Sequence, residues 1–521
     1  MVDLVGERTL RDLLEERERR YQGKKCLICE DAQGLVKSLS YQELLDNVGA
    51  AARGFSALGI KKGDAIVVHL ANSPEFLISW FGLAWLGAIL VPSNTANTAF
   101  EIGYVFERSE AVGIVTSPDY LQAVESAMVG KTGIKILART DETFTGWYLL
   151  SELMVTGGEV PRPPLRSEDI LEMIFTSGTT SRPKGVLLTH ANALRSGERS
   201  SRSFALQDSD RCLTALPAFH VNAQSMAIMG SLTVGATCIM LEQYSASKFW
   251  TQVRNYEATA TSLVAMQVRT LLAQPPSEGD SNHQLRRVFY AINVTNHEKE
   301  EFERRFNVEL INGYGLSEAM TIVTVAPTFG EKRWPSIGLP AFDRQVKIVD
   351  ENGDEVPPNT VGEIVVSGIP GRTLMVGYFK DPEATAETLK DGWLHTADNA
   401  YADEQGYLYF FDRKKDVIKR AGENISATEV EFVLVEHPLV AEAAVIGVPD
   451  DIRDEAVKAY VVLVEGKQLE VGELLDHCRE RMASFKVPSI IEIRESLPKT
   501  SIGKVEKKVL RAESSDNRGP R

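Results

Sequence analysis

The sequence predicts an α/β protein with a large N-terminal domain, in which helices sandwich mixed and parallel sheets, and a small α+β C-terminal domain. From about residue 40 to residue 340, short β-branched apolar runs alternate with segments of helical length. This alternation is typical of parallel βαβ units in a layered sheet. After about residue 340 the rhythm changes, and 521 residues are more than one domain usually holds.

Three apolar runs, 65–70, 111–116 and 308–312, are expected to be buried strands of the large domain. The longest apolar run, 76–91, is shorter than the roughly 20 residues that a membrane-spanning helix needs. The preceding tripeptide 73–75, Ser-Pro-Glu, provides a capping hydroxyl, a first-turn proline and a first-turn acid. We therefore expect a buried helix that runs into a strand, and no membrane span.

The last part of the chain is expected to contain antiparallel sheet. Segments 345–350 and 362–367 predict a strand pair, with the turn signal Asn-Gly between them. Farther on, the pattern predicts two strands and one amphipathic helix, at residues 441–448, 456–464 and 469–485. A charged stretch, 412–416, precedes this block. We therefore expect the two domains to span residues 1–412 and 413–521.

Composition excludes several classes of function. With 57 basic and 72 acidic residues the net charge is −15, so no overall field attracts nucleic acid, and any phosphate must be held locally. Five scattered cysteines do not make a disulfide framework. The N-terminus lacks the apolar core of a signal peptide, which favours a cytoplasmic location.

One decapeptide between two apolar runs has the composition of a phosphate-binding loop. It comprises Thr176, Ser177, Gly178, Thr179, Thr180, Ser181, Arg182, Pro183, Lys184 and Gly185. Glycines let backbone N–H groups approach an anion, hydroxyls donate hydrogen bonds and lysine supplies positive charge. The spacing is not that of a Walker A loop. On composition alone, a flexible surface loop is an equally good interpretation.

The order of residues favours the phosphate loop, because the decapeptide resembles the phosphate loop of the adenylate-forming acyl-CoA synthetase superfamily. Further segments resemble that superfamily's other motifs in the same order over most of the chain. Within it, the chain most resembles the crotonobetaine/carnitine-CoA ligases. Besides the loop, this narrower resemblance rests on 81–84 (Phe-Gly-Leu-Ala), 217–220 (Pro-Ala-Phe-His), 332–338 (Lys-Arg-Trp-Pro-Ser-Ile-Gly) and 452–456 (Ile-Arg-Asp-Glu-Ala).

Residues 312–318 are similar to the superfamily's second nucleotide motif, and the site residues within it are Asn312, Tyr314, Gly315, Ser317 and Glu318. The resemblance implies that Tyr314 stacks on adenine, Ser317 bonds the α-phosphate and Glu318 ligates Mg²⁺. A carboxylate suits that hard cation. Without the other motifs, tyrosine and glutamate at this spacing are as consistent with an ordinary turn.

Motifs nearer the C-terminus complete the implied site. Asp398 and Arg413 match residues that bind the ribose, and Lys415 matches the hinge before a mobile C-terminal domain. Gly422 matches a glycine that approaches pantetheine. Lys504 lies in a Pro-Lys-Thr-x-x-Gly-Lys pattern that resembles the adenylation-lysine motif. The alternative, non-functional interpretations are a solvated run of charges around residue 415 and an ordinary surface lysine at position 504.

The acyl site is less specified by the sequence. His220 matches an aromatic-histidine motif beside the acyl pocket, although a satisfied core histidine is the alternative interpretation. A quaternary ammonium group would favour aromatic partners. Phe219, Trp250 and Tyr290 are candidates for such a cage, but the sequence does not show that any of them forms one.

The implied function is a ligase that uses ATP, Mg²⁺ and coenzyme A as cofactor and co-substrates, forming an acyl-adenylate and then a thioester. Its partners would be small molecules and a second copy in a homodimer. Open alternatives are a fatty or aryl acid ligase, a carrier-protein ligase, a luciferase-like oxygenase and a scaffold protein that retains the fold. The joint presence of Glu318, Asp398 and Lys504 argues against the scaffold.

Two residues depart from the superfamily pattern. Ala397 stands where glycine is usual before Asp398, and Ala421 replaces the usual glycine or serine before Gly422. If position 397 needs a positive φ, alanine costs about 1 kcal/mol or more. Tolerated drift is one interpretation. The other is an enzyme that is impaired in adenylation and acts mainly in thioester formation.

Overall fold

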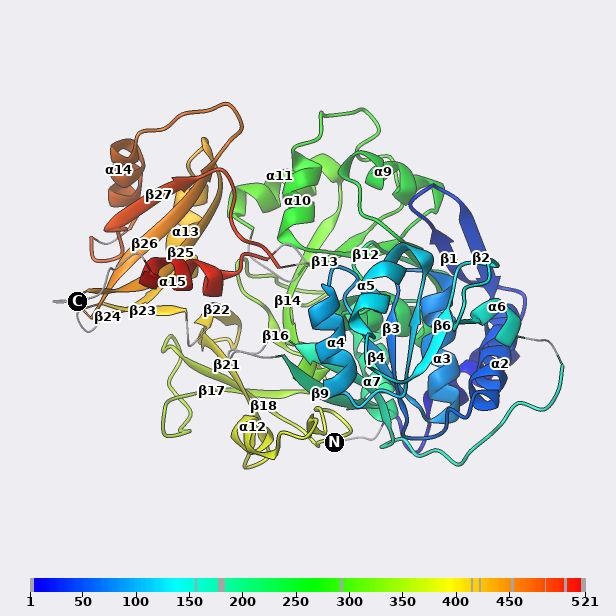
Figure 1. Cartoon of the computed structure of the whole chain (residues 1–521). Helices are drawn as coiled ribbons and strands as arrows, with labels where there is room; N and C mark the ends of the chain where they lie inside the picture. The colour runs from blue at the N-terminus through cyan, green and yellow to red at the C-terminus, as the bar shows by residue number, and fades with distance from the viewer. Residues whose placement is uncertain are drawn as a thin grey trace. The chain divides into compact units, whose positions relative to one another are not determined.

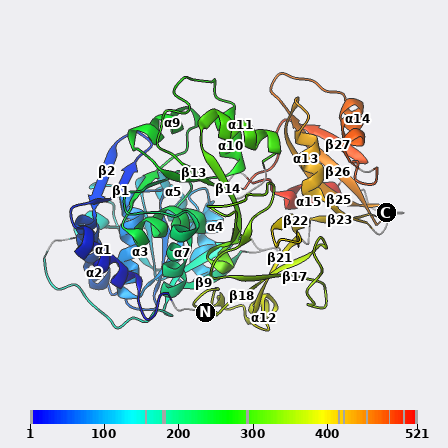
Figure 2. The same ribbon diagram turned by 180° about the vertical axis from the view of Figure 1, so that it is seen from behind.

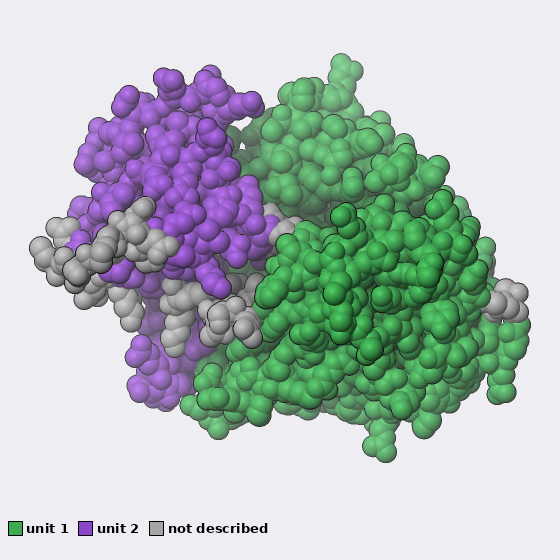
Figure 3. Space-filling model, in the orientation of Figure 1, with its two compact units in different colours: residues 1–346, 366–395 green, residues 347–365, 396–521 purple. Residues whose placement is uncertain are grey.

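The computed structural model describes residues 4–154, 157–176, 183–290, 294–413, 416–420, 423–450, 454–482, 484–500 and 504–516. The chain divides into two compact units, coloured separately in Figure 3. Unit 1 comprises residues 1–346 and 366–395, and unit 2 comprises residues 347–365 and 396–521. The predicted division into a large domain, 1–412, and a mobile C-terminal domain, 413–521, stays a prediction.

Two sheets form the framework of unit 1, and both are parallel in the middle and antiparallel at an edge (Figure 1). Over the described residues, the eight-stranded sheet has the order β19 (Gly377–Tyr378), β9 (Lys184–Thr189), β8 (Ile170–Thr176), β4 (Ile89–Pro92), β3 (Ala65–His69), β5 (Gly113–Thr116), β6 (Ile134–Leu137), β7 (Tyr148–Leu149). The nine-stranded sheet, counted in the same way, has the order β16 (Leu339–Pro340), β15 (Thr321–Val325), β14 (Glu309–Leu316), β13 (Arg287–Tyr290), β12 (Ala260–Leu263), β10 (Arg211–Thr214), β11 (Thr237–Leu241), β1 (Lys25–Glu30), β2 (Val36–Ser40).

The helices of unit 1 cover these sheets with apolar side chains. Phe249, Trp250, Phe302 and Phe306, on two of the helices in Figure 2, share one core with Val288 of the nine-stranded sheet. The helical elements are α1 (Leu10–Tyr21), α2 (Tyr41–Ala57), α3 (Pro74–Leu86), α4 (Ala99–Arg108), η1 (Pro118–Tyr120), α5 (Leu121–Ala127), α6 (Leu150–Leu153), α7 (His190–Ser203), η2 (Ala223–Met229), α8 (Gly230–Val234), α9 (Ala246–Asn255), α10 (Ala265–Leu272), α11 (Asn296–Phe306), η3 (Ser317–Ala319) and α12 (Pro382–Thr388).

The sequence patterns in the large domain are confirmed at the level of elements. The runs 65–70, 111–116 and 308–312 correspond to β3, β5 and the start of β14. Helix α3 begins after Ser73, whose hydroxyl accepts the N–H of Phe76 at 3.2 Å, and it leads into β4 as expected. In the described part of the chain, no helix is both long enough and apolar enough to cross a membrane.

A third sheet contains the predicted pair 345–350 and 362–367. Among the described residues it has the order β17 (Gln345–Val349), β18 (Gly362–Ser367), β21 (Trp393–Ala402), β20 (Leu389–Lys390), with β22 (Leu408–Arg413) paired to β21. The two predicted strands are neighbours in the sheet. The tight turn between Asp350 and Asp354 occupies only the start of their connection, so the link is longer than a two-residue hairpin.

The C-terminal part of unit 2 forms a small α+β layer. Its elements are β23 (Val417–Arg420), β24 (Glu423–Ser426), α13 (Ala427–Val435), β25 (Val440–Asp450), β26 (Asp454–Leu463), α14 (Val471–Arg481), β27 (Ile490–Arg494) and α15 (Lys507–Asp516). The two predicted strands are confirmed as β25 and β26. Helix α14 is shorter than the predicted 469–485, because the backbone adopts an extended conformation at Met482 and so ends the helix. Leu469 and Phe485 pack on the same core from outside the helix.

Candidate active site

The described ends of the decapeptide lie on one hairpin. Thr176 ends β8, Lys184 begins β9, and the two are opposite each other in the antiparallel register. Residues Ser177, Gly178, Thr179 and Thr180 lie outside the described part of the chain. The described residues therefore place the predicted phosphate loop between two paired strands, at the antiparallel edge of the eight-stranded sheet.

The second predicted motif, 312–318, occupies the end of β14, in the nine-stranded sheet, and the start of the turn η3. The side-chain amide of Asn312 donates to the carbonyl of Ser336 at 2.8 Å, and Tyr314 is only 9% exposed. A Cβ at Gly315 would lie 2.3 Å from the carbonyl oxygen of Thr321, so any larger residue would collide with the neighbouring strand. Packing thus requires glycine at 315 and fixes the backbone just before Ser317.

Strained backbone follows the turn that carries Ser317 and Glu318. Met320 and Thr321 follow the 3₁₀ turn η3 with φ of 47° and 67°, in the left-handed region that non-glycine residues rarely adopt. Arg344 donates to the carbonyl of Ala319, and Arg199 to that of Met320. Strained backbone of this kind persists only where its surroundings hold it.

A buried charge cluster supplies that support. Arg199 of α7 is 1% exposed, and its guanidinium donates two hydrogen bonds of 2.8 Å to the carboxylate of Asp343. Arg195 lies 3.8 Å from the same carboxylate. Burial opposes ionisation of Asp343, but the hydrogen bond and charge of Arg199, with Arg344 and Arg195 nearby, keep its pKa below the usual value. One carboxylate therefore neutralises part of a cluster of three buried arginines.

Tyr378 brings the two motifs together. Its hydroxyl donates to Glu318 Oε1 at 2.9 Å, and the ammonium of Lys184 lies 5.0 Å from the centre of its ring. Burial and the negative charge of Glu318 raise the pKa of Tyr378, so the phenol stays protonated and donates this bond. Lys184 and Glu318, predicted from separate motifs, thus contact the same side chain.

The two residues that are predicted to bind the ribose, Asp398 and Arg413, both belong to unit 2. Asp398 of β21 lies opposite Arg413 of β22 in the antiparallel register and is 7% exposed. Its N–H donates to the hydroxyl of Thr396 at 3.2 Å. The side chain of Arg413 is outside the described part of the structure. The register brings these two backbone positions together, which is what a shared ribose site requires.

Ala397, beside Asp398, has φ of 56° and donates its N–H to Glu363 Oε1 at 2.9 Å. A left-handed conformation costs an L-residue roughly 1–2 kcal/mol, whereas glycine adopts it freely. We expect Ala397→Gly to raise the free energy of unfolding of unit 2 by about 1 kcal/mol. Calorimetric melting of the purified chain measures the change.

The matched control is Ala400→Gly on the same strand. Ala400 is fully buried and lacks a positive φ, so glycine there removes a buried methyl group and weakens the strand. We expect a loss of about 1 kcal/mol or more. Equal destabilisation by both variants would show that Ala397 is not strained.

Lys504 is hydrogen-bonded to Thr500 in unit 2. Its backbone N–H donates to the hydroxyl of Thr500 at 3.2 Å, and its carbonyl accepts the N–H of Thr500 at 2.7 Å. The residue is exposed. Lys415, Ala421 and Gly422 lie outside the described residues, so the predicted hinge and pantetheine positions remain predictions.

His220 lies just before a π-helical element in unit 1. The turn Pro217–His220 is closed by a 3.0 Å backbone hydrogen bond, and the ring of Phe219 lies 4.8 Å from that of His220. Element η2 follows at residue 223, and π-helical turns are frequent at functional sites. The role of His220 beside the acyl group stays a prediction.

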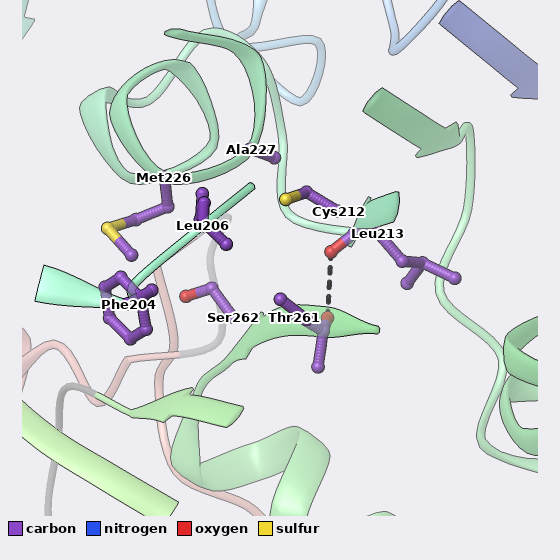
Figure 4. Close-up of a pocket in the computed structure, with 9 residues that line it drawn as sticks. Phe204, Leu206, Cys212, Leu213, Met226, Ala227, Thr261 and Ser262 are labelled. Atoms are coloured by element: carbon purple, nitrogen blue, oxygen red, sulfur yellow. Dashed lines mark hydrogen bonds between the residues drawn. The ribbon is translucent and has the colours of Figure 1, made fainter. Parts of the chain in front are cut away.

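A cavity of about 20 Å³ lies farther along η2 (Figure 4). Its lining is mainly apolar and includes Phe204, Leu206, Cys212, Met226 and Ala227. In Figure 4, the hydroxyl of Thr261 donates to the carbonyl of Leu213, at 2.8 Å. This volume accommodates about one water molecule. The cavity is therefore too small to hold an acyl group as it stands.

Trp250 was a candidate for binding a cationic acyl group. Its ring stacks on His283 at 4.8 Å and on Phe306 at 4.3 Å, and Phe302 packs beside it. It therefore belongs to the apolar core, which removes it as a cage residue. Phe219 is 7% exposed, and the side chain of Tyr290 lies outside the description.

Sequence reasoning missed Tyr378 and the Asp343 cluster. Tyr378 belongs to a two-residue strand and lies 60 residues from the glutamate that it contacts. Asp343 and Arg199 are 144 residues apart. Neither pair has a local spacing that would indicate a contact, so only the fold reveals them.

Comparison with known proteins defines the class. The chain belongs to the AMP-binding enzyme family: the family pattern matches residues 14–379, and that of the AMP-binding enzyme C-terminal domain matches residues 429–504. Together with the fold, this makes it an AMP-forming acyl-CoA synthetase of the adenylate-forming class, as the motifs predicted.

Within this family, the chain is similar to several CoA ligases. The chain is 42% identical over 517 residues to the crotonobetaine/carnitine-CoA ligase of Salmonella arizonae, which covers 98% of this chain and 100% of the relative. Its fold is similar to that of the anthranilate-CoA ligase AuaEII in complex with anthranoyl-AMP, with TM-score 0.90, 25% identity and 99% of each chain covered. It is also similar to o-succinylbenzoate-CoA synthetase of Bacillus subtilis in complex with ATP and magnesium ion, with TM-score 0.84, 28% identity and coverage of 97% and 99%.

Proposed function

We propose that this chain joins crotonobetaine or carnitine to coenzyme A, through an acyl-adenylate. The observation that carries the substrate assignment is the 42% identity, over almost the whole chain, with a crotonobetaine/carnitine-CoA ligase. The site supports the reaction class because Tyr378 contacts the ammonium of Lys184 and the carboxylate of Glu318, and Thr176 lies opposite Lys184 in the hairpin.

The reaction has two steps because a carboxylate is a poor acceptor for a thiol. In the first, a carboxylate oxygen attacks the α-phosphorus of ATP, the bond to the β-phosphate oxygen breaks, and pyrophosphate leaves. In the second, the CoA sulfur attacks the acyl carbonyl, AMP leaves, and the thiol proton passes to solvent. Negative charge develops on phosphoryl oxygens in the first step, so positioned cations and hydrogen-bond donors accelerate it.

Several side chains would hold the nucleotide. The loop at 176–185 and Lys184 would bind the phosphates, Tyr314 the adenine and Ser317 the α-phosphate. In unit 2, Asp398 and Arg413 would bind the ribose, and Lys504 would stabilise the meeting of carboxylate and α-phosphate. The motifs support these roles, as do the opposed backbone positions of Thr176 and Lys184 and of Asp398 and Arg413.

Mg²⁺ is the metal that this donor set fits. Glu318 is a hard oxygen ligand, one of whose carboxylate oxygens is held by the hydroxyl of Tyr378. Magnesium sites of nucleotide enzymes commonly combine one or two carboxylates with substrate phosphates. When bound, Mg²⁺ would neutralise charge on the phosphates.

The acyl group would lie beside His220 and Phe219, along η2. An aromatic ring there suits a trimethylammonium group by cation–π attraction. For the second step, we propose that the C-terminal domain rotates about Lys415 and brings Gly422 toward pantetheine. We also propose a homodimer, and a cytoplasmic location in keeping with five free, buried cysteines.

The substrate is tested by CoA-thioester formation over a panel of acids. Crotonobetaine and carnitine are compared with hexanoate, benzoate and 5,5-dimethylhex-2-enoate, in which a carbon replaces the quaternary nitrogen of crotonobetaine. We expect kcat/KM for crotonobetaine to exceed that of its neutral isostere by at least about tenfold, because the proposed aromatic ring, that of Phe219, would attract the positive charge. Preference for benzoate or hexanoate would instead identify an aryl or fatty acid ligase, and transfer only to a carrier protein would identify that alternative.

A second candidate function is thioester formation from acyl-adenylate made elsewhere. The observation that favours it is the left-handed backbone of Ala397, next to the proposed ribose ligand Asp398. Acid-dependent ATP–pyrophosphate exchange in the natural chain would reject this candidate. Exchange that appears only in Ala397→Gly would support it.

A further inference from the structure

We propose that Tyr378 is a positioning residue that holds Lys184 with its ring and Glu318 with its hydroxyl. The inference rests on the proposed function, since it assigns those two residues to the triphosphate and to Mg²⁺. Tyr378 belongs to none of the motifs that the sequence indicated. Its contacts are a 2.9 Å hydrogen bond to Glu318 Oε1 and a distance of 5.0 Å from the Lys184 ammonium to the ring centre.

The backbone of Tyr378 is fixed from two sides. Strand β19 pairs antiparallel with β9, so that Tyr378 lies opposite Val186, two residues beyond Lys184. On the other side, the N–H of Tyr378 donates to the hydroxyl of Thr385 on α12 at 2.9 Å. The preceding residue has φ of 154°, and a Cβ there would lie 2.7 Å from Cγ2 of Thr385, so position 377 requires glycine.

The same segment also holds the backbone of Glu318. The N–H of Met375 donates to the carbonyl of Glu318 at 2.7 Å. The N–H of Val376 donates to the carbonyl of Leu187 at 2.9 Å, and that of Phe379 to the carbonyl of Gly185 at 2.7 Å. Residues 375–379 therefore contact both the hairpin below the phosphate loop and the turn that carries Glu318.

The two parts of the Tyr378 side chain act on different charges. The hydroxyl restricts one oxygen of Glu318, which leaves the carboxylate in one orientation for a metal. The ring face attracts the ammonium of Lys184 and limits the positions of a long, flexible side chain before phosphate binds. Removing the hydroxyl should weaken metal binding alone, and removing the ring should also weaken binding of the triphosphate.

The test compares Tyr378→Phe with Tyr378→Leu in the full chain. Calorimetry measures ATP binding without metal, and Mn²⁺ binding to the ATP complex is followed by electron paramagnetic resonance. For Tyr378→Phe we expect about tenfold weaker Mn²⁺ binding and unchanged metal-free ATP affinity. For Tyr378→Leu we expect the same metal defect together with about fivefold weaker metal-free ATP binding.

Tyr256→Phe is the matched control. Tyr256 also donates its hydroxyl to a carboxylate, that of Glu30, which belongs to no part of the proposed site. This variant should bind Mn²⁺ and ATP as the natural chain does. Unchanged or tighter Mn²⁺ binding in Tyr378→Phe would overturn the role of the hydroxyl, and metal-free ATP affinity in Tyr378→Leu equal to that of Tyr378→Phe would overturn the role of the ring.

The binding measurements separate this inference from the proposed function. If the natural chain binds ATP and Mn²⁺ but activates no acid, the proposed function fails while the role of Tyr378 is still decided by binding. If Tyr378→Leu does not fold, Tyr378→Phe decides on the hydroxyl, and Tyr378→Met, which removes the aromatic face but keeps a flexible apolar side chain, decides on the ring. Metal-free ATP binding about fivefold weaker than that of the natural chain would support the ring's role, and binding at the natural affinity would overturn it.

Discussion

Lys504→Ala is expected to slow acyl-adenylate formation by about a hundredfold or more, while thioester formation from supplied acyl-adenylate changes little. The expected size is that of losing one positioned group that stabilises charge in a transition state. Lys504 is exposed, so alanine removes the ammonium without disturbing a core. ATP–pyrophosphate exchange measures the first step, and single-turnover thioester formation from synthetic acyl-adenylate measures the second.

The matched control is Lys499→Ala in the same motif. The ammonium of Lys499 forms a 3.0 Å ion pair with Glu442 within unit 2. Its loss should leave both half-reactions close to those of the natural chain, because an exposed ion pair contributes little. Equal losses in the two half-reactions for Lys504→Ala would contradict the assignment of that lysine to adenylation.

Asp343→Asn is expected to destabilise unit 1 by about 3–5 kcal/mol. The variant keeps the shape of the side chain but removes the carboxylate that Arg199 and Arg195 contact, and so leaves buried positive charge without its partner. All six tryptophans of the chain lie within residues 1–346 and 366–395. Tryptophan fluorescence during urea denaturation therefore reports on unit 1.

An exposed ion pair in the same unit provides the comparison. Lys380 and Glu110 form a salt bridge with side chains 53% and 59% exposed. Glu110→Gln should cost less than about 1 kcal/mol, because solvent screens both charges. If Asp343→Asn cost no more than this surface variant, the buried cluster would not be what holds the strained backbone after Glu318.

Local patterns predicted the framework and the two nucleotide motifs because those signals are short in sequence. The runs at β3 and β5 are buried along their whole length. The apolar segments on either side of the decapeptide form the hairpin β8–β9, in which Thr176 and Lys184 lie opposite each other. The departure at Ala397 was also visible, since alanine replaces an expected glycine. From the sequence, alanine is expected to be unfavourable at 397 if the backbone there has a positive φ, and the structure gives this residue a φ of 56°.

Contacts between distant segments could not be predicted in this way. The bond from Tyr378 to Glu318 depends on the pairing of a two-residue strand with β9, and no charge or periodicity indicates that pairing. Helix α14 was predicted too long for a related reason. Leu469 and Phe485 continue its apolar pattern, but they reach the core from loops.

The two-step reaction is tested by mixing the purified chain with ATP, Mg²⁺ and crotonobetaine, without CoA, and identifying the enzyme-bound product by mass spectrometry. We expect crotonobetainyl-AMP and pyrophosphate. Addition of CoA should then convert the adenylate to the thioester with release of AMP. Release of ADP instead of AMP, or thioester formation without any adenylate in a rapidly quenched sample, would contradict the two-step reaction.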